Sequence, residues 1–173
     1  MPIQKSKPRL TVDIICLFPN SLKSFFLFGL LGISQKNGLL QINLYHLRDF
    51  AKDKRRNIDD RPFAGGPGMV LKMEPLESAV KKIRLLSTKR PYVILTSPGG
   101  RQFNQQLAEK LISKKHLVIV WGRYEGVDER FIESYVDQEI SIGDYVLTGG
   151  EAAALVMVET LCRLIPGVLG NKQ

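Results

Sequence analysis

Three glycine-containing segments carry the residue types that could hold a small-molecule ligand mainly through the main chain: residues 97–100, 122–126 and 141–151. Glycine has no Cβ atom, so the chain can adopt positive φ there and can come close to a ligand or to another segment. Residues 141–151 contain Gly143, Gly149 and Gly150 among few long side chains. This composition is typical either of a tight strand-to-helix turn or of a ligand loop, and the segment alone leaves both open.

The common nucleotide-binding and hydrolytic motifs are missing from the sequence. No G-x-G-x-x-G follows the first predicted strand and there is no G-x-x-x-x-G-K-[ST], which argues against a Rossmann dinucleotide site and a P-loop. The only histidines are His46 and His116, and there is no G-x-S-x-G, so we interpret both histidines as structural residues. Cys16 and Cys162 have no metal-ligand spacing and indicate reduced, buried thiols in a cytosolic protein.

Buried strands alternate with amphipathic helices along the chain. Residues 10–18, 92–96 and 117–121 are apolar runs typical of buried strands, and residues 39–46 alternate like a half-buried strand. Helices are expected from about residue 21 and over 75–86, 107–111 and 152–165. This order predicts an α/β fold, with a mostly parallel sheet and helices on both faces. Each glycine segment follows a predicted strand, so all three should meet at one sheet edge around a ligand.

Length and charge narrow the class of protein. The 173 residues, 44% of them hydrophobic, predict one compact domain. A net charge of +8 favours a polyanionic partner such as nucleic acid, although it also suits simple solubility. Residues 48–61 mix basic and acidic side chains without apolar periodicity, which predicts an exposed loop that is either solvated or bound to phosphates. No apolar run reaches the ~18 residues of a membrane span, and residues 1–9 read as a basic arm.

Several longer motifs occur in the order found in one family. The chain resembles the bacterial tRNA (guanine-N1)-methyltransferases, of the SPOUT class with a deep C-terminal trefoil knot. The motifs that carry the resemblance are Phe18-Pro19, Arg48-Asp49-Phe50, Asp59-Asp60-Arg61-Pro62 and residues 65–69, 97, 122–130, 141–151 and 163–170. The knot is implied by this resemblance alone, because knots are almost absent from folds in general.

The resemblance implies a methyl donor, a substrate and a partner. S-adenosyl-L-methionine is the expected cofactor, and tRNA is the expected substrate, at the guanosine immediately 3′ of the anticodon. A cytoplasmic homodimer with its active site at the subunit interface is also implied. The expected cofactor contacts are Leu95, Thr96, Ser97, Pro98, Gly122, Tyr124, Glu125, Ile142, Gly143, Asp144, Tyr145, Val146, Leu147, Gly149 and Gly150. The expected RNA contacts are Arg48, Lys52, Lys54, Arg55, Arg56 and Asp59.

Methyl transfer to guanine N1 requires a base for the N1 proton and a donor for charge that gathers on O6. By resemblance Arg163 orients the cofactor and the base, and its planar guanidinium suits the developing O6 oxyanion. The alternative is a structural i, i+4 pair with Glu159. We favour the functional interpretation because residues 152–165 are apolar on nearly every side and should be buried.

The sequence departs from the family pattern at its end. The family's general base is an aspartate just beyond Gly170, and this chain ends at Gln173. We therefore expect residues 10–170 to form the cofactor-binding domain, residues 171–173 to begin a linker, and the C-terminal tRNA-binding domain to be absent. On this view the chain is inactive or weakly active alone, and no metal is assigned. The alternative is a knotted module that binds cofactor or RNA without catalysis.

Overall fold

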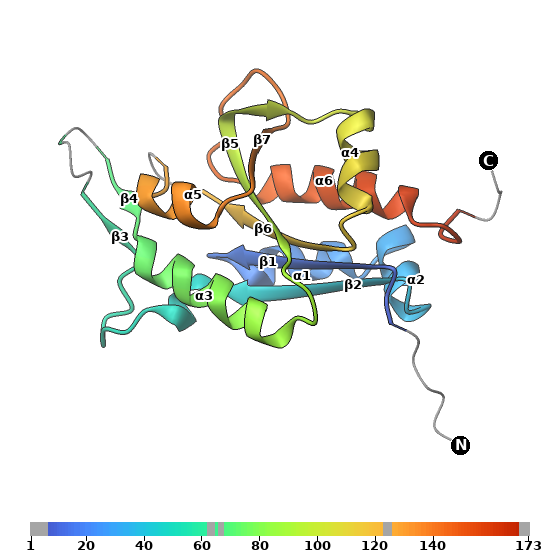
Figure 1. The fold of residues 1–173 in the computed structure, drawn as a ribbon, viewed down its shortest axis with the longest axis horizontal. Coiled ribbons are helices and arrows are strands. Elements are labelled where there is room, and N and C mark those ends of the chain that lie inside the picture. Colours follow the sequence, from blue (N-terminus) through green and yellow to red (C-terminus); the bar gives the residue numbers. More distant parts are fainter. Residues whose placement is uncertain (1–6, 62–64, 66–67, 123–125, 170–173) are drawn as a thin grey trace.

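A five-stranded sheet with the strand order β2-β1-β6-β5-β7 forms the centre of the molecule (Figure 1). The computed structural model describes residues 7–61, 65, 68–122 and 126–169. Every neighbouring pair in the sheet is parallel, as predicted. Its strands are β1 (Leu10–Cys16), β2 (Leu40–His46), β5 (Tyr92–Gln102), β6 (His116–Trp121) and β7 (Gln138–Ser141). Two short antiparallel strands, β3 (Asp59–Asp60) and β4 (Val70–Leu71), form a separate ribbon.

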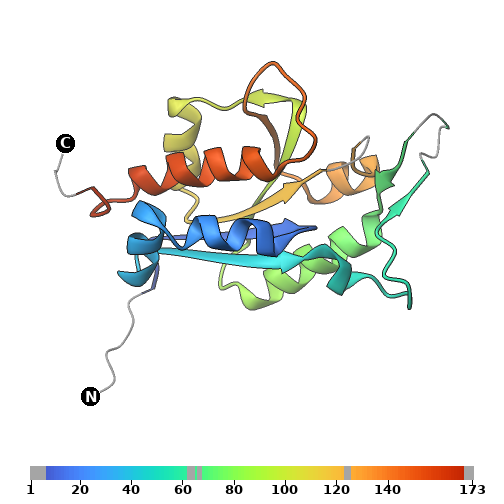
Figure 2. The ribbon, with the colours of Figure 1, turned by 180° about the vertical axis from the view of Figure 1, so that it is seen from behind.

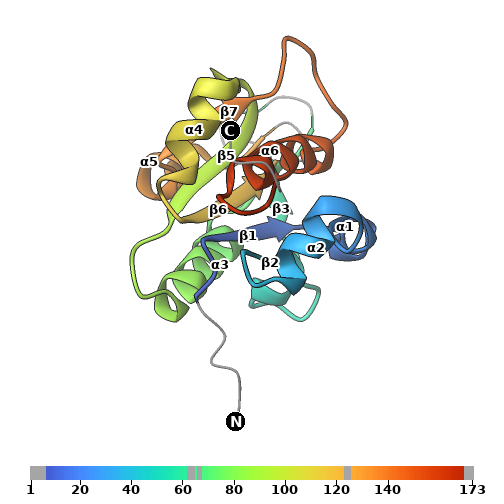
Figure 3. The ribbon, with the colours of Figure 1, turned by 90° about the vertical axis from the view of Figure 1, so that its right-hand side faces the viewer.

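Helices cover both faces of this sheet, which confirms the α/β class. The helices on one face are α1 (Pro19–Phe26), α2 (Gly29–Lys36), α4 (Gln105–Ile112) and α6 (Glu151–Leu164). The helices on the other face are α3 (Met73–Leu86) and α5 (Glu129–Tyr135). A 3-10 turn, η1 (Leu47–Phe50), follows β2. Figure 3 shows α3 on one side of the strands and α1, α2 and α6 on the other.

Two hydrophobic cores result from the alternation of side chains along the strands. On β6, Leu117 and Ile119 face α1, α2, α4 and α6, whereas Val118 and Val120 face α3 and α5. On β1, Ile14 belongs to the first core and Ile15 to the second. Because both faces are covered, the central strands are apolar at nearly every position, which is why they are recognisable in the sequence.

Strand β5 does not end at Thr96 as predicted but continues to Gln102. A bulge lies between Thr96 and Arg101, and both residues pair with Ile140 of β7. A Cβ atom added at Gly100 would lie 2.5 Å from the Ile140 nitrogen. The Pro-Gly-Gly segment therefore keeps the strand paired by letting two backbones approach closely, instead of ending it.

The helices also differ from the prediction in four respects. The segment after residue 21 forms two helices, because Gly29 adopts φ +56 at the start of α2. Leu86, expected in the core, is 64% exposed at the end of α3. Arg84, expected in water, has buried guanidinium nitrogens and lies 5.3 Å from the centre of the Tyr135 ring. Helix α6 is not buried all round, since Val156 is 44% exposed.

Residues 142–150 carry the chain from the outer strand β7 back to α6, which packs against the middle of the sheet. This loop is the orange segment at the top of Figure 1. At its end, Gly150 lies directly against Trp121 of β6 and Thr96 of β5. In the described part of the chain, no helix is long and apolar enough to cross a membrane.

Candidate functional site

A cavity of about 450 Å³ lies at the carboxyl ends of β5, β6 and β7. The three glycine segments meet there, as expected for loops that follow parallel strands. The predicted residues that line it are Leu95, Thr96, Ser97, Pro98, Gly122, Ile142, Gly143, Tyr145, Val146, Leu147, Gly149 and Gly150. Asp144 is exposed on the loop and does not line the cavity. Tyr124 and Glu125 lie outside the described residues.

Some lining residues were not predicted. They include Gly126, Val127, Glu129, Ile132, Glu139, Ile140, Ser141, Thr148 and Ala153. Ser141, like Gly126 and Thr148, lies within a glycine segment that was expected to meet the ligand, and Ala153 follows Gly150 by three residues. Glu129 and Ile132 come from α5, whose position beside the cavity follows from tertiary packing and has no local signal in the sequence.

The wall behind the cavity contains two buried polar atoms without a partner. The Thr96 hydroxyl oxygen and the Trp121 ring nitrogen make no hydrogen bond within the described part of the chain. A Cβ atom added at Gly150 would lie 2.3 Å from the Trp121 Cβ and 2.5 Å from the Thr96 Oγ1. Glycine at position 150 is thus required by packing, and the Thr96 hydroxyl is left without a described partner although buried polar groups normally have one.

The loop over the cavity is held by local hydrogen bonds. The Ser141 hydroxyl donates to the Gly143 carbonyl oxygen over 2.9 Å, and the Tyr145 hydroxyl donates to the Ile142 carbonyl over 3.4 Å. The Tyr145 ring packs on Gly143, where an added Cβ atom would lie 2.3 Å from the ring. Val146 at the tip is 82% exposed. The loop therefore presents apolar side chains beside the cavity.

The charged side chains that line the cavity are acidic among the described residues. Glu129 and Glu139 line it, and no lysine or arginine does so among the described residues. Beside them, Asp128 accepts hydrogen bonds from the Arg130 Nε at 2.9 Å and the Arg130 backbone nitrogen at 3.0 Å. The Arg130 side chain holds the pKa of Asp128 below its usual value. An acidic lining favours a ligand that carries positive charge.

Arg163 lies away from this cavity within one chain. It is exposed near the end of α6, about 15 Å along the helix axis from Ala153 at 1.5 Å per residue. The described residues include no ion pair or hydrogen bond of Arg163, so the alternative pair with Glu159 does not form. The guanidinium is therefore free to meet a group that belongs to another molecule.

Residues 48–61 are more ordered than an exposed loop, because they contain η1 and β3. Arg48 donates to the Arg56 carbonyl over 3.1 Å, and Arg56 donates to Asp49 over 3.1 Å. Ile58 is fully buried and anchors the segment. Lys52, Lys54 and Arg55 remain exposed, whereas Arg48 and Asp59 are half-buried.

Comparisons with known proteins agree with this architecture. Residues 10–173 match the family model described as tRNA (Guanine-1)-methyltransferase TrmD. A tRNA (guanine-N(1)-)-methyltransferase of Dictyoglomus turgidum is 50% identical over 162 residues, which are 94% of this chain and 64% of that protein. One from Vibrio cholerae serotype O1 is 48% identical over 160 residues, covering 92% of this chain and 65% of that protein.

A crystal structure of the tRNA (m1G37) methyltransferase from Aquifex aeolicus superposes with a TM-score of 0.87 and 37% identity, covering 96% of this chain and 74% of that one. The fold is therefore the SPOUT fold with its trefoil knot. The chain spans 64% of the length of the Dictyoglomus turgidum relative. Because the family model matches nearly the whole chain, the chain belongs to the tRNA (guanine-1)-methyltransferase TrmD family.

Proposed function

We propose that this chain is the cofactor-binding domain of an enzyme that methylates guanine N1 in tRNA, at the guanosine immediately 3′ of the anticodon. The proposal is supported by the relatives, which are named as tRNA (guanine-N(1)-)-methyltransferases and a tRNA (m1G37) methyltransferase. The observation that carries the proposal is the cavity at the carboxyl ends of β5, β6 and β7, with its glycine lining and its unpaired Thr96 hydroxyl. S-adenosyl-L-methionine, when bound, supplies an electrophilic methyl group on a sulfonium.

The residues present fit this cofactor. A volume of about 450 Å³ lies within the ~300–1,000 Å³ usual for small-molecule sites. Glu129 and Glu139 suit the positive sulfonium and amino groups. Beside the cavity the Thr96 hydroxyl lacks a described partner, and the glycines at 122, 143, 149 and 150 leave main-chain atoms accessible. Tyr124, Glu125 and Asp144 remain proposed contacts on the strength of the resemblance.

Arg163 would then serve a cavity on a second copy of the chain. The exposed face of α6 carries Ala152, Val156, Glu159 and Arg163. Beside it, Phe25 and Phe28 of the adjoining α1–α2 region are 57% and 73% exposed. We infer a two-fold homodimer through this face, because exposed apolar patches mark interaction surfaces. In it, Arg163 stabilises the charge that develops on guanine O6.

We assign no general base within the described residues. Asp128 is held by Arg130, and the resemblance places the base aspartate after Gly170. Residues 10–170 are therefore expected to bind the cofactor, and the N1 proton is expected to be taken by a residue that follows them. We also place the protein in the cytoplasm, with the support that Cys16 and Cys162 are free and buried.

The test has two arms. Calorimetry with S-adenosyl-L-methionine should give one site per chain, and no heat at millimolar ligand contradicts the cofactor assignment. A chimera that continues after Gln173 with the downstream residues of the Dictyoglomus turgidum relative should methylate a tRNA transcript. The same transcript with adenosine in place of the target guanosine is the control. If the chimera binds both cofactor and tRNA and transfers no methyl group, the alternative of a non-catalytic binding module is favoured.

A further inference from the structure

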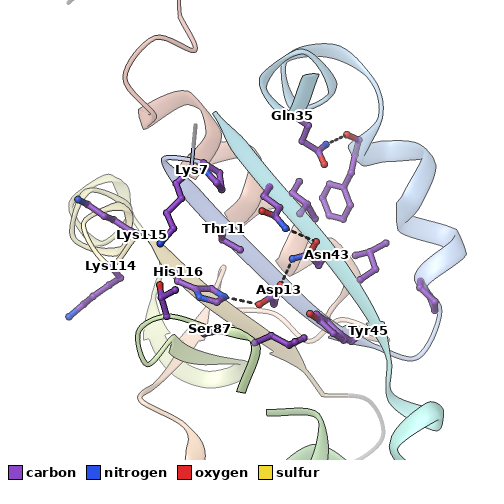
Figure 4. Close-up of a pocket in the computed structure, with 18 of the residues that line it drawn as sticks. Lys7, Thr11, Asp13, Gln35, Asn43, Tyr45, Ser87, Lys114, Lys115 and His116 are labelled. Atoms are coloured by element: carbon purple, nitrogen blue, oxygen red, sulfur yellow. Dashed lines mark hydrogen bonds and ion pairs between the residues drawn. The ribbon is translucent and has the colours of Figure 1, made fainter. Parts of the chain in front are cut away.

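A hollow of about 1060 Å³ runs along the edge strand β2 and reaches the first residues of β1 and β6 (Figure 4). His116 in this hollow begins β6, whereas Trp121 at the cofactor cavity ends it. At ~3.3 Å per residue these positions are about 17 Å apart. Of the residues that the structure describes, none lines both the hollow and the cavity. The hollow is thus a separate feature that methyl transfer does not use.

A chain of hydrogen bonds crosses three strands on the floor of the hollow. The Asn43 amide nitrogen of β2 donates to Asp13 Oδ1 of β1 over 2.6 Å, and His116 Nε2 of β6 lies 2.7 Å from Asp13 Oδ2. The Asp13 side chain is 3% exposed, and the His116 side chain is 20% exposed. Because a carboxylate accepts, Nε2 carries the proton, and the other ring nitrogen has no partner among the described residues. Both carboxylate oxygens of Asp13 therefore have hydrogen-bond partners, and the second ring nitrogen of His116 is left for a ligand.

The rim of the hollow is strongly basic. Its cationic side chains are Lys7, Lys23, Lys89, Arg90, Lys114 and Lys115. Asp13 is the only carboxylate among the lining residues described. Arg90 pairs with Asp137 at 2.7 Å and Lys114 lies over the Tyr92 ring at 4.8 Å. Lys7, Lys89 and Lys115 are exposed and have no ion pair within the described residues. This excess of unneutralised positive charge selects for a polyanion.

We propose that this hollow binds the phosphodiester backbone of single-stranded RNA. Lysines distributed around a wide hollow suit a polymer with several phosphates, whereas one small anion would need donors that converge on a single point. Tyr45 in the wall offers an aromatic face on which a base can stack. This binding is independent of methyl transfer, because the hollow and the cofactor cavity are separate.

The probe is a fluorescent 12-residue oligouridylate without cofactor, so that it contains no guanosine to methylate. The test variant is Lys89→Gln with Lys115→Asn, because Lys115 adopts φ 64 and asparagine tolerates that conformation. The control is Lys82→Gln with Lys110→Gln, which removes the same charge from exposed positions outside the hollow. A further comparison is Lys52→Gln with Lys54→Gln in residues 48–61.

By anisotropy, the hollow variant should bind at least about fivefold more weakly than the control variant at 100 mM salt. The salt dependence should become shallower. The magnitude of the slope of log K against log salt concentration should decrease by about 1.4, which is ~0.7 for each of the two lost contacts to a single strand. Thermal unfolding should be unchanged. Equal affinities for the hollow and control variants overturn the proposal, as does a loss confined to the Lys52 and Lys54 variant. Competition by uridine monophosphate as strong as by the oligomer overturns it in favour of a mononucleotide.

Discussion

Adding a single methyl group at Gly150 is expected to lower the free energy of unfolding and to change the shape of the cavity. Its φ of −82 is open to any residue, so only the space around it matters. In Gly150→Ala the new Cβ atom would meet Trp121, which is 1% exposed and cannot move outward. We expect the free energy of unfolding to fall by about 1–3 kcal/mol. Urea titration measures it, with the only tryptophan of the chain as the fluorescent reporter.

Gly122→Ala is the matched control for this prediction. A Cβ atom at Gly122 would lie 3.7 Å from the nearest side-chain atom, which is an ordinary contact. Its unfolding free energy should stay within about 0.5 kcal/mol of the parent protein. Equal stability losses in both variants would show that the close packing around Gly150 is not the cause.

At the scale of elements, the pairing of β5 with β7 depends on Gly100. An added Cβ atom at this residue would lie 2.5 Å from the Ile140 nitrogen and 2.6 Å from the Glu139 carbonyl carbon. Gly100→Ala should therefore separate the strands beyond the bulge and cost about 1–3 kcal/mol. Its neighbour gives the control, since a Cβ atom at Gly99 has nothing within 4 Å. Hydrogen exchange of the β7 amides should accelerate in Gly100→Ala and not in Gly99→Ala; the reverse order would refute this account.

Helix α5 should lose stability in acid through Asp128. The side chain of Asp128 caps the helix at the Arg130 backbone nitrogen and pairs with the Arg130 guanidinium at 2.6 Å. Its pKa is lowered from the usual 3.8, so its stabilisation is complete above about pH 4 and is lost as pH falls through the folded pKa. Arg130 is 58% exposed, so solvent screens the pair and its contribution to the free energy of unfolding is small.

Asp128→Asn should keep the cap, lose this contribution at neutral pH and show a shallower decline in unfolding free energy below pH 4. Urea titrations between pH 2 and pH 7 give the comparison. Glu133→Gln on the same helix removes one exposed carboxylate that has no ion pair in the described residues. A decline equally shallow in Glu133→Gln would assign the effect to net charge instead of to the Asp128–Arg130 pair.

The elements that local periodicity determines were predictable from the sequence, and those that depend on distant partners were not. The apolar runs of β1 and β6 indicated buried strands because both of their faces are covered. Arg84 was misplaced because its partner Tyr135 is far away in the sequence. The floor of the basic hollow joins Asp13, Asn43 and His116 from three strands, and no local pattern marks such a cluster.

The cavity and the hollow differ in the charge of the side chains that line them. The cavity at the carboxyl ends of β5, β6 and β7 is lined by Glu129 and Glu139, whereas the hollow along β2 has a rim of lysines and one arginine. The net charge of +8 is therefore unevenly distributed. A cationic ligand is favoured in the cavity and a polyanion in the hollow, and both can bind without competing because the two share no described lining residue.

The predicted dimer also involves the whole molecule, because its interface combines the exposed face of α6 with the α1–α2 region. Figure 2 shows α6 lying beside α1 and α2 on one side of the molecule. Val156 on this face is 44% exposed, and Val156→Glu would place a charge in the proposed interface at little cost to the helix. We expect the variant to sediment as a monomer at micromolar concentration, where the parent chain is a dimer.

Leu85→Glu is the control for this variant, because Leu85 is 83% exposed on α3, on the other face of the sheet. It introduces the same charge and should leave the dimer intact. None of the exposed α6 side chains of the proposed interface is among the described residues that line the cavity, so monomeric Val156→Glu should still bind the methyl donor. Methyl transfer by the extended chimera should nevertheless be lost, because Arg163 then has no partner cavity to reach. Full activity in a monomeric variant would place Arg163 outside the reaction.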